Sequence, residues 1–106
     1  MEKNLDIAGD TEESWFVYII LCSDDSLYTG ITTDPERRLS QHADGRGARY
    51  FHGRQPLRLV YLEQGHSRSS ASRRECLIKS MPRLEKVRLI AGQAAANGPK
   101  EQDPVY

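Results

Sequence analysis

The stretch from Trp15 to His42 decides the fold: WFVYIILCSDDSLYTGITTDPERRLSQH. It opens with an apolar run, Trp15 to Leu21, in which both alternating faces are largely apolar. Successive side chains of a strand point to opposite faces, so this pattern predicts a central strand that is covered on both sides. The polar residues 23–26 have the composition of a hairpin turn, and Leu27 to Thr32 is therefore expected to pair antiparallel with the first strand.

The same stretch ends in a short predicted helix. Asp34 can cap its N-terminus, and Pro35 fits its first position. Arg38 and His42 lie four residues apart and are therefore neighbours on one helical face, while Arg37 lies on the adjacent stripe. The helix thus presents a guanidinium and an imidazole together.

Two tyrosines of the hairpin are expected to meet. Tyr18 lies in the first strand and Tyr28 in the second, and antiparallel pairing can bring them together across the ladder. Gly30 lacks a β-carbon, so either the backbone bends at this position or another group approaches it closely.

The rest of the chain is predicted to complete an α+β domain. Leu57 to Glu63 is expected to be a third strand, followed by a helix from Ala71 to Met81 and, after Pro82, by another helix. Alternation in the third strand predicts two faces, one with Leu57, Leu59 and Tyr61 and the other with Arg58, Val60 and Leu62. The expected fold is a small three-stranded antiparallel sheet flanked by helices, a mixed α/β architecture.

Residues 15–92 are expected to form one domain, because 106 residues suffice for a single modest core. Residues 1–14 are polar and acidic and are interpreted as a flexible leader, and residues 93–106 as a C-terminal tail. The helical start signals are ambiguous, since three serines compete as the cap of the helix after the third strand: Ser67, Ser69 and Ser70. In the last helix an apolar stripe is expected to face the core, and one of two glycines to end it: Leu84, Val87 and Ala91, with Gly92 or Gly98.

The composition excludes two classes of protein. No apolar run approaches the roughly 20 residues that span a membrane. The N-terminus lacks the basic start and apolar core of a secretory signal, which favours a cytoplasmic location. Cys22 and Cys76 have no metal-ligand spacing, and both are predicted to be reduced thiols in the core.

The formal net charge is zero, but the charges are unevenly distributed, and residues 34–90, which we call the body, are basic. Residues 1–33 carry seven acidic groups and one basic group, whereas residues 34–90 carry thirteen basic and six acidic groups. Eleven of the fifteen basic residues are arginines, which suit bidentate contact with phosphate. This distribution favours a polyanionic partner such as nucleic acid, and a solvated charged surface is the alternative.

These features resemble the GIY-YIG nuclease domain. Phe16-Val17-Tyr18 and Tyr28-Thr29-Gly30 stand in the places of its two tripeptides, and Arg38 and His42 follow at the family's positions. Arg74-Glu75, inside a helical pattern, is similar to the family's metal-binding segment. The resemblance covers Trp15 to Ile90 and is closest to the small single-domain bacterial members of the UPF0213 type.

The resemblance implies phosphodiester hydrolysis with a divalent metal, Mg²⁺ or Mn²⁺. Glu75 would be the single protein ligand of the metal, which is acceptable for Mg²⁺ because that ion keeps much of its hydration. Arg38 would steady the phosphate, and Tyr18 would help to activate the water. Tyr28 would orient the water or the phosphate, and His42 would assist.

Contacts to nucleic acid are expected from six basic side chains and from close approach at one glycine: Arg37, Arg46, Arg49, Arg54, Arg74, Lys79 and Gly30. The loop from Ala43 to Pro56 is rich in Gly and Arg and interleaves them with aromatic residues. It is either a strip that contacts phosphates and bases or a surface loop whose Tyr50 and Phe51 pack into the core.

Each catalytic assignment has a structural alternative. Glu75 could pair with Lys79, His42 could cap a helix or pack, and a strand tyrosine is often only a packing residue. His52 and His66 are expected at the surface.

The leading hypothesis is a DNA endonuclease, structure-selective in repair or recombination, whose specificity comes from its basic face or from a protein partner. The alternatives are a catalytically weak or inactive module that binds nucleic acid through the same face, and an interaction domain of a larger repair complex.

Overall fold

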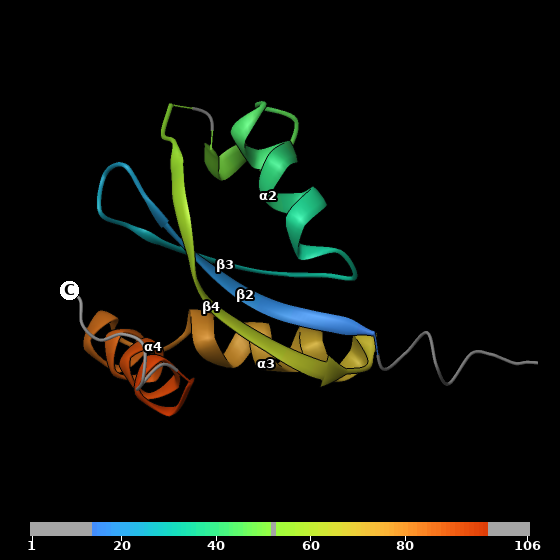
Figure 1. The fold of residues 1–106 in the computed structure, drawn as a ribbon, viewed down its shortest axis with the longest axis vertical. Coiled ribbons are helices and arrows are strands. Elements are labelled where there is room, and N and C mark those ends of the chain that lie inside the picture. The colour runs from blue at the N-terminus through green and yellow to red at the C-terminus, as the bar shows by residue number, and fades with distance from the viewer. Residues whose placement is uncertain (1–13, 52, 98–106) are drawn as a thin grey trace, which may run out of the picture.

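The computed structural model describes residues 14–51 and 53–97. Its elements follow in the order β2 (Trp15–Cys22), β3 (Leu27–Thr32), α2 (Pro35–Ala43), a 3₁₀ helix (Arg49–Phe51), β4 (Pro56–His66), α3 (Arg68–Lys79) and α4 (Arg83–Asn97). Figure 1 shows the strands as one sheet, with α2 on one side of it and α3 on the other. The predicted three-stranded antiparallel sheet with flanking helices is confirmed. The predicted leader, apart from Ser14, and positions 98–106 of the predicted tail lie outside the described residues.

β2 is the central strand of the sheet. The strand order is β3-β2-β4, and both pairings are antiparallel. Gly30 lies opposite Tyr18, and Tyr28 lies opposite Ile20. Because residues two apart on a strand share a face, both tyrosines lie on the same face of the sheet, as predicted.

Each face of the sheet has its own buried cluster. The face covered by α3, which we call the α3 side, buries Val17, Ile19, Tyr61, Ala71 and Ile78. The opposite face, the α2 side, buries Tyr18, Ile20, Cys22 and Phe51. The apolar pattern of β2 on both faces therefore has a direct structural cause, because a helix-covered core lies on each side of it.

β4 is longer and less regular than predicted. It spans Pro56–His66, and its pairing with β2 is interrupted by bulges. Leu59 lies opposite Ile20 and Tyr61 lies opposite Ile19, so Val60 is the extra residue of a bulge. The prediction that Leu59 and Tyr61 share a face is therefore wrong. Leu59 packs on the α2 side and Tyr61 on the α3 side.

The helix caps account for where α2 and α3 begin. Asp34 accepts a backbone N–H of the first turn of α2 at 3.2 Å, and Pro35 occupies the first helical position, as predicted. α3 begins at Arg68, three residues before the predicted start. Ser67 is its cap and forms a capping box with Ser70, in which each side-chain oxygen accepts the other residue's backbone N–H.

α4 uses a different face from the one predicted. Leu84 and Val87 are 59% and 41% exposed, and Ala91 is exposed as well, so the prediction that this stripe faces the core is wrong. Leu89 and Ile90 pack against the α3-side cluster instead. The helix continues through Gly92 and ends at Asn97, immediately before the second predicted glycine. Residues 93–97 of the predicted tail are therefore helical.

The two cysteines differ in environment. Cys22 is buried, as predicted, whereas Cys76 lies on the exposed side of α3, so its assignment to the core is wrong.

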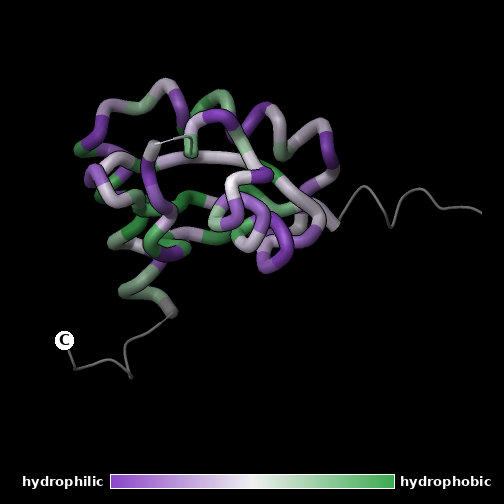
Figure 2. Tube along the Cα trace, turned by 90° about the horizontal axis from the view of Figure 1, so that it is seen from above, coloured by the Kyte–Doolittle hydropathy of each residue, from purple (hydrophilic) through white to green (hydrophobic). Residues whose placement is uncertain are grey.

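The described helices are not those of a membrane span. Hydrophobic and hydrophilic segments alternate along the trace in Figure 2. Across residues 14–51 and 53–97, no helix has the length and apolarity needed to cross a membrane.

Candidate active site

Four aromatic rings from four elements meet on the α2 side of the sheet. Tyr18 comes from β2, Tyr28 from β3, His42 from α2 and Phe51 from the 3₁₀ helix. The ring centroids of Tyr18 and Tyr28 are 6.2 Å apart, those of Tyr28 and His42 are 5.4 Å apart, and those of His42 and Phe51 are 4.3 Å apart. The fold thus brings three of the predicted catalytic side chains into one cluster.

A hydrogen bond joins Tyr18 to His42 inside this cluster. Oη of Tyr18 lies 3.0 Å from Nε2 of His42, and both residues are almost fully buried. Burial raises the pKa of Tyr18 well above its usual value, with a further increase from Tyr28, and the nearby guanidinium of Arg38 opposes these effects only in part. Tyr18 is therefore a neutral hydroxyl in the free protein at neutral pH.

His42 is a neutral imidazole in the same environment. Burial, and to a lesser extent the positive charge of Arg38, lowers the pKa of His42 to about 4. Its other ring nitrogen, Nδ1, accepts the backbone N–H of Ala48 at 3.2 Å. His42 is thus buried, packed within the cluster and bonded at both ring nitrogens, and it does not cap a helix.

Arg38 lies where the buried cluster meets solvent. Its guanidinium influences the pKa of both Tyr18 and His42 and donates a hydrogen bond to Oε1 of Gln41 at 2.9 Å. The same side chain lines a cleft of about 380 Å³, together with Trp15, Ile31, Thr32, Thr33, Asp34, Arg37 and Gln41. The cleft is therefore lined by two guanidinium groups, those of Arg37 and Arg38, which are suited to binding an anion.

Glu75 lies on α3, away from the aromatic cluster. Ala71 and Ile78 form the buried stripe of the helix that faces the sheet. A helix turns about 100° per residue, so Arg74 and Glu75 lie on opposite flanks of that stripe. Arg74 bonds to Glu63 of β4 at 3.0 Å. Because β3 and β4 are the two edges of the sheet, Glu75 lies on the flank directed towards β3.

The carboxylate of Glu75 has a cationic neighbour. It forms an ion pair with Lys79 at 3.1 Å, the structural alternative named for it from sequence. The Lys79 side chain is 53% exposed, so the pair is a weak surface pair that an approaching cation can displace. Among the residues that the structure describes, no three His, Cys, Asp or Glu side chains gather into a metal-binding group. One carboxylate with water and phosphate oxygens nevertheless fits Mg²⁺, which keeps much of its hydration.

Several basic side chains that were predicted to contact nucleic acid have acidic partners. Arg46 pairs with Asp44 at 2.6 Å, and Arg54 pairs with Asp24 at 2.8 Å. The pair with Asp24 attaches the loop to the hairpin. Within the loop, the guanidinium of Arg54 lies over the ring of Tyr50, 4.0 Å from its centroid. Arg37 and Arg49, also predicted to contact nucleic acid, are exposed.

The two aromatics of the loop support the packing alternative. Phe51 is 5% exposed and lies within the aromatic cluster. Tyr50 is partly buried against it and lies 5.0 Å from the ring of Tyr28. The loop is therefore part of the wall of the site.

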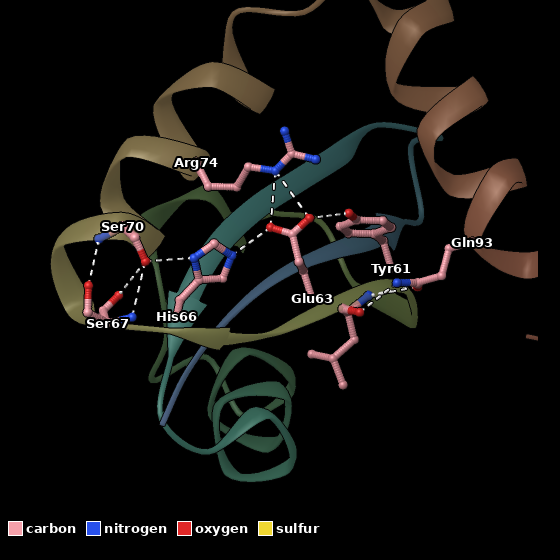
Figure 3. Close-up of polar contacts among 8 residues, drawn as sticks. Tyr61, Glu63, His66, Ser67, Ser70, Arg74 and Gln93 are labelled. Atoms are coloured by element: carbon pink, nitrogen blue, oxygen red, sulfur yellow. Dashed lines mark hydrogen bonds and ion pairs between the residues drawn. The ribbon is translucent and has the colours of Figure 1, made fainter. Parts of the chain in front are cut away.

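A polar network between β4 and α3 was not predicted. Figure 3 shows the carboxylate of Glu63 among three donors. It accepts from Oη of Tyr61 at 2.6 Å, from Nε2 of His66 at 2.7 Å and from Nε of Arg74 at 3.0 Å. Burial would raise the pKa of Glu63, but these hydrogen bonds outweigh it and lower the pKa below its usual value.

This network corrects the surface assignment of His66, whose side chain is only 18% exposed. Its second ring nitrogen, Nδ1, lies 2.8 Å from Oγ of Ser70, in the capping box of α3. His52 lies outside the described residues. The spacing of Tyr61, Glu63 and His66 was a local signal for this cluster, but Arg74 is eleven residues beyond Glu63 and gave none.

Comparison with known proteins agrees with this geometry. A model of the GIY-YIG catalytic domain matches residues 14–86. The chain is 47% identical over 78 residues to a UPF0213 protein of Natronomonas pharaonis. This match covers 74% of this chain and 92% of that protein. The chain is also 41% identical over 99 residues to a UPF0213 protein of Nitratidesulfovibrio vulgaris. This match covers 91% of this chain and 90% of the relative.

A solved structure is also similar. A protein from E. faecalis, determined by solution NMR, matches with a TM-score of 0.55 and 31% identity over 91% of this chain and 97% of that one. The fold, the tyrosine cluster and the matched residues lead to one conclusion: the chain belongs to the GIY-YIG family of nuclease-type catalytic domains.

Proposed function

We propose that this protein is a DNA endonuclease that hydrolyses phosphodiester bonds with one divalent metal ion, Mg²⁺ or Mn²⁺. The observation that carries the proposal is the buried Tyr18–His42 hydrogen bond with the Arg38 guanidinium beside it. We also propose that the protein acts in the cytoplasm and is selective for DNA structure in repair or recombination. Its specificity would come from the basic face or from a protein partner.

Hydrolysis of a phosphodiester requires an oriented water and neutralisation of the charge on the phosphate. Arg38, which lines the cleft, would bind a non-bridging oxygen of the phosphate. Tyr18, close enough to Arg38 for the guanidinium to influence its pKa, and Tyr28 beside it would orient the attacking water. Because Tyr18 is neutral before the reaction, it accepts a proton from water only as it releases its own.

The metal site in this proposal is centred on Glu75. The fit rests on one carboxylate on the flank of α3 nearest β3, whose present partner, Lys79, is exposed and weakly held. A bound divalent ion would neutralise charge on the phosphate and lower the pKa of a bound water. Glu75 would hold the ion, and the bonds of Arg74 and His66 to Glu63 would help to fix the rotation of α3 that directs Glu75 towards β3.

Binding of DNA draws on the basic residues of the body. Arg37 lines the cleft beside Arg38, and Arg49 is exposed on the loop that walls the aromatic cluster. Gly30, which was also predicted to contact nucleic acid, has its open side filled by the ring of Tyr18, so we assign it no contact with the DNA. Arg46, Arg54, Arg74 and Lys79 each have an acidic partner, so they would contribute less to DNA binding than the exposed Arg37 and Arg49. Binding of this kind weakens steeply as the salt concentration rises.

The proposal is tested by incubating labelled duplex, single-stranded, flapped and branched DNA with the protein and Mg²⁺ or Mn²⁺, and in parallel with EDTA. We expect metal-dependent cleavage of at least one form by the wild type, and its loss in Tyr18→Phe, Arg38→Ala and Glu75→Gln. Cleavage that persists in EDTA or in all three variants would contradict the assignment.

A second candidate function is supported by the ion pair that occupies Glu75. A module that binds DNA without cutting it would keep Glu75 paired with Lys79 permanently. In that case no DNA is cleaved, binding remains sensitive to salt, and Arg37→Ala or Arg49→Ala weakens binding while Glu75→Gln does not.

A further inference from the structure

The two ring nitrogens of His42 have different partners. Nδ1 lies 3.2 Å from the backbone nitrogen of Ala48, and Nε2 lies 3.0 Å from Oη of Tyr18. A backbone N–H can only donate a hydrogen bond, so Nδ1 must accept and carries no proton. A neutral imidazole has one N–H, which therefore lies on Nε2.

We propose that the peptide between Gly47 and Ala48 fixes the tautomer of His42, so that Nε2–H donates to Tyr18 and the hydroxyl hydrogen of Tyr18 is directed to the substrate. This inference rests on the proposed nuclease function and adds two positioning residues to it. Neither residue touches the substrate in this account. Each acts through His42.

The loop is built around the imidazole. A β-carbon at Gly47 would overlap Nδ1 of His42 and lie 2.8 Å from its Cε1, so only glycine allows the peptide to approach this closely. The backbone N–H of Arg46 donates to the carbonyl oxygen of Gln41 at 2.8 Å, which returns the chain to the end of α2. Phe51 packs on the other side of the imidazole, with ring centroids 4.3 Å apart.

The fixed tautomer decides where the proton of Tyr18 can go. Nε2 of His42 already holds a hydrogen, so His42 is not the base that deprotonates Tyr18. When the water oxygen bonds to phosphorus, its proton passes to Oη of Tyr18. The original hydroxyl hydrogen of Tyr18 passes to an oxygen of the phosphate and ends on the leaving sugar oxygen as the ester bond breaks. Tyr18 and His42 are neutral before and after the step, and the protons balance.

The tautomer is measured directly by ¹⁵N NMR of the imidazole nitrogens in the full-length wild-type protein at neutral pH. We expect the signal pattern of a neutral ring protonated at Nε2. A His42 protonated at Nδ1, or an even mixture of tautomers, would overturn the inference whether or not DNA is cleaved. Protonation at Nε2 in a protein that cleaves no DNA would support the fixed tautomer and contradict the proposed function instead.

A matched pair of variants tests the source of the effect. Ala48→Pro removes the N–H that bonds to Nδ1, whereas Ala48→Ser keeps it. We expect Ala48→Pro to shift the tautomer population and lower kcat at least about tenfold with KM nearly unchanged, because a residue that orients the site acts on the chemical step. Ala48→Ser should match the wild type in both readouts. If Ala48→Pro does not fold, the ¹⁵N measurement on the wild-type protein still decides the tautomer. In a folded Gly47→Ala, whose β-carbon would displace the imidazole from the peptide, a wild-type tautomer would contradict the assignment.

Discussion

Gly30 lies directly opposite Tyr18 in the β2–β3 ladder, and a β-carbon at Gly30 would lie 2.5 Å from Oη of Tyr18. The ring of Tyr18 therefore extends over the neighbouring strand at a position that only glycine leaves open. This contact sets the position of the hydroxyl that bonds to His42.

Replacement of Gly30 by alanine should displace Tyr18. We expect Gly30→Ala to lower the free energy of unfolding by about 1–3 kcal/mol, because the ring is buried and has little room to move. Gly92→Ala is the matched control, since a β-carbon there meets nothing within 4 Å. In the interior of α4 that change should raise the free energy of unfolding by about 0.5–1 kcal/mol. Urea denaturation measures both, and equal effects of the two substitutions would refute the contact.

His42 should make the protein less stable as the pH falls. Its pKa is about 4 in the folded state against the ordinary 6.5, so between these values the unfolded chain binds a proton that the folded chain does not. The stabilising contribution is complete above pH 6.5 and decreases towards pH 4, by about 3 kcal/mol in all.

The readout for His42 is the difference in unfolding free energy between wild type and His42→Gln, measured by urea denaturation at several values of pH. Other groups titrate in both proteins, so their effects cancel. The difference should shrink as the pH falls from 6.5 to 4. A difference that stays constant over this range would mean that His42 is not held neutral by the fold.

The bond between Glu63 and Arg74 should contribute more to stability than a bond made by an exposed arginine does. Arg74→Ala removes a charged donor from the half-buried carboxylate of Glu63 and should lower the free energy of unfolding by about 2 kcal/mol. Arg73, which is exposed and bonds to Ser69, is the control, and Arg73→Ala should change it by less than about 0.5 kcal/mol. Comparable losses in the two variants would show that the network adds nothing specific.

Thr29 offers a stabilising substitution. Its hydroxyl is buried and has no hydrogen-bond partner among the residues that the structure describes. Valine has nearly the same shape without the polar atom, so Thr29→Val should raise the free energy of unfolding by about 1 kcal/mol. Thr33→Val, at an exposed position, should have little effect. A lower melting temperature for Thr29→Val would indicate that the hydroxyl has a partner after all.

The segment from Trp15 to His42 could be predicted because its signals are local. Alternating apolar residues, a polar turn, and the Asp34-Pro35 cap each act within a few residues, and the structure follows them closely. The bulge at Val60 could not be predicted, since it depends on the register with β2 and not on β4 itself.

Which face of α4 is buried could not be predicted, because it depends on a contact between Gln93 and Leu62, which are far apart in the sequence. Both stripes of the helix have helical spacing, so the sequence did not distinguish them. The amide of Gln93, labelled in Figure 3, accepts from the main-chain nitrogen of Leu62 at 3.1 Å and donates to its carbonyl oxygen at 2.6 Å. This pairing covers the edge of β4 and turns Leu89 and Ile90 towards the core.

Part of the candidate site could be predicted from local signals and part could not. Strand pairing predicted that Tyr18 and Tyr28 meet, and helical spacing put His42 beside Arg38; the contact of His42 with the two tyrosines was implied only by the family resemblance. The peptide at Ala48 gave no signal, because its contact with His42 is made by backbone atoms that every residue other than proline has.

Whether Glu75 supports metal-dependent cleavage is decided by comparing Glu75→Gln with Glu85→Gln, an exposed control on α4, for both cleavage and binding of the preferred DNA in Mg²⁺. The account predicts that Glu75→Gln lowers the cleavage rate at least about 100-fold while its salt-dependent binding stays within a factor of a few of the wild type. Glu85→Gln should leave both unchanged. Cleavage by Glu75→Gln at the wild-type rate would contradict the account, because the carboxylate would then hold no metal that the reaction needs.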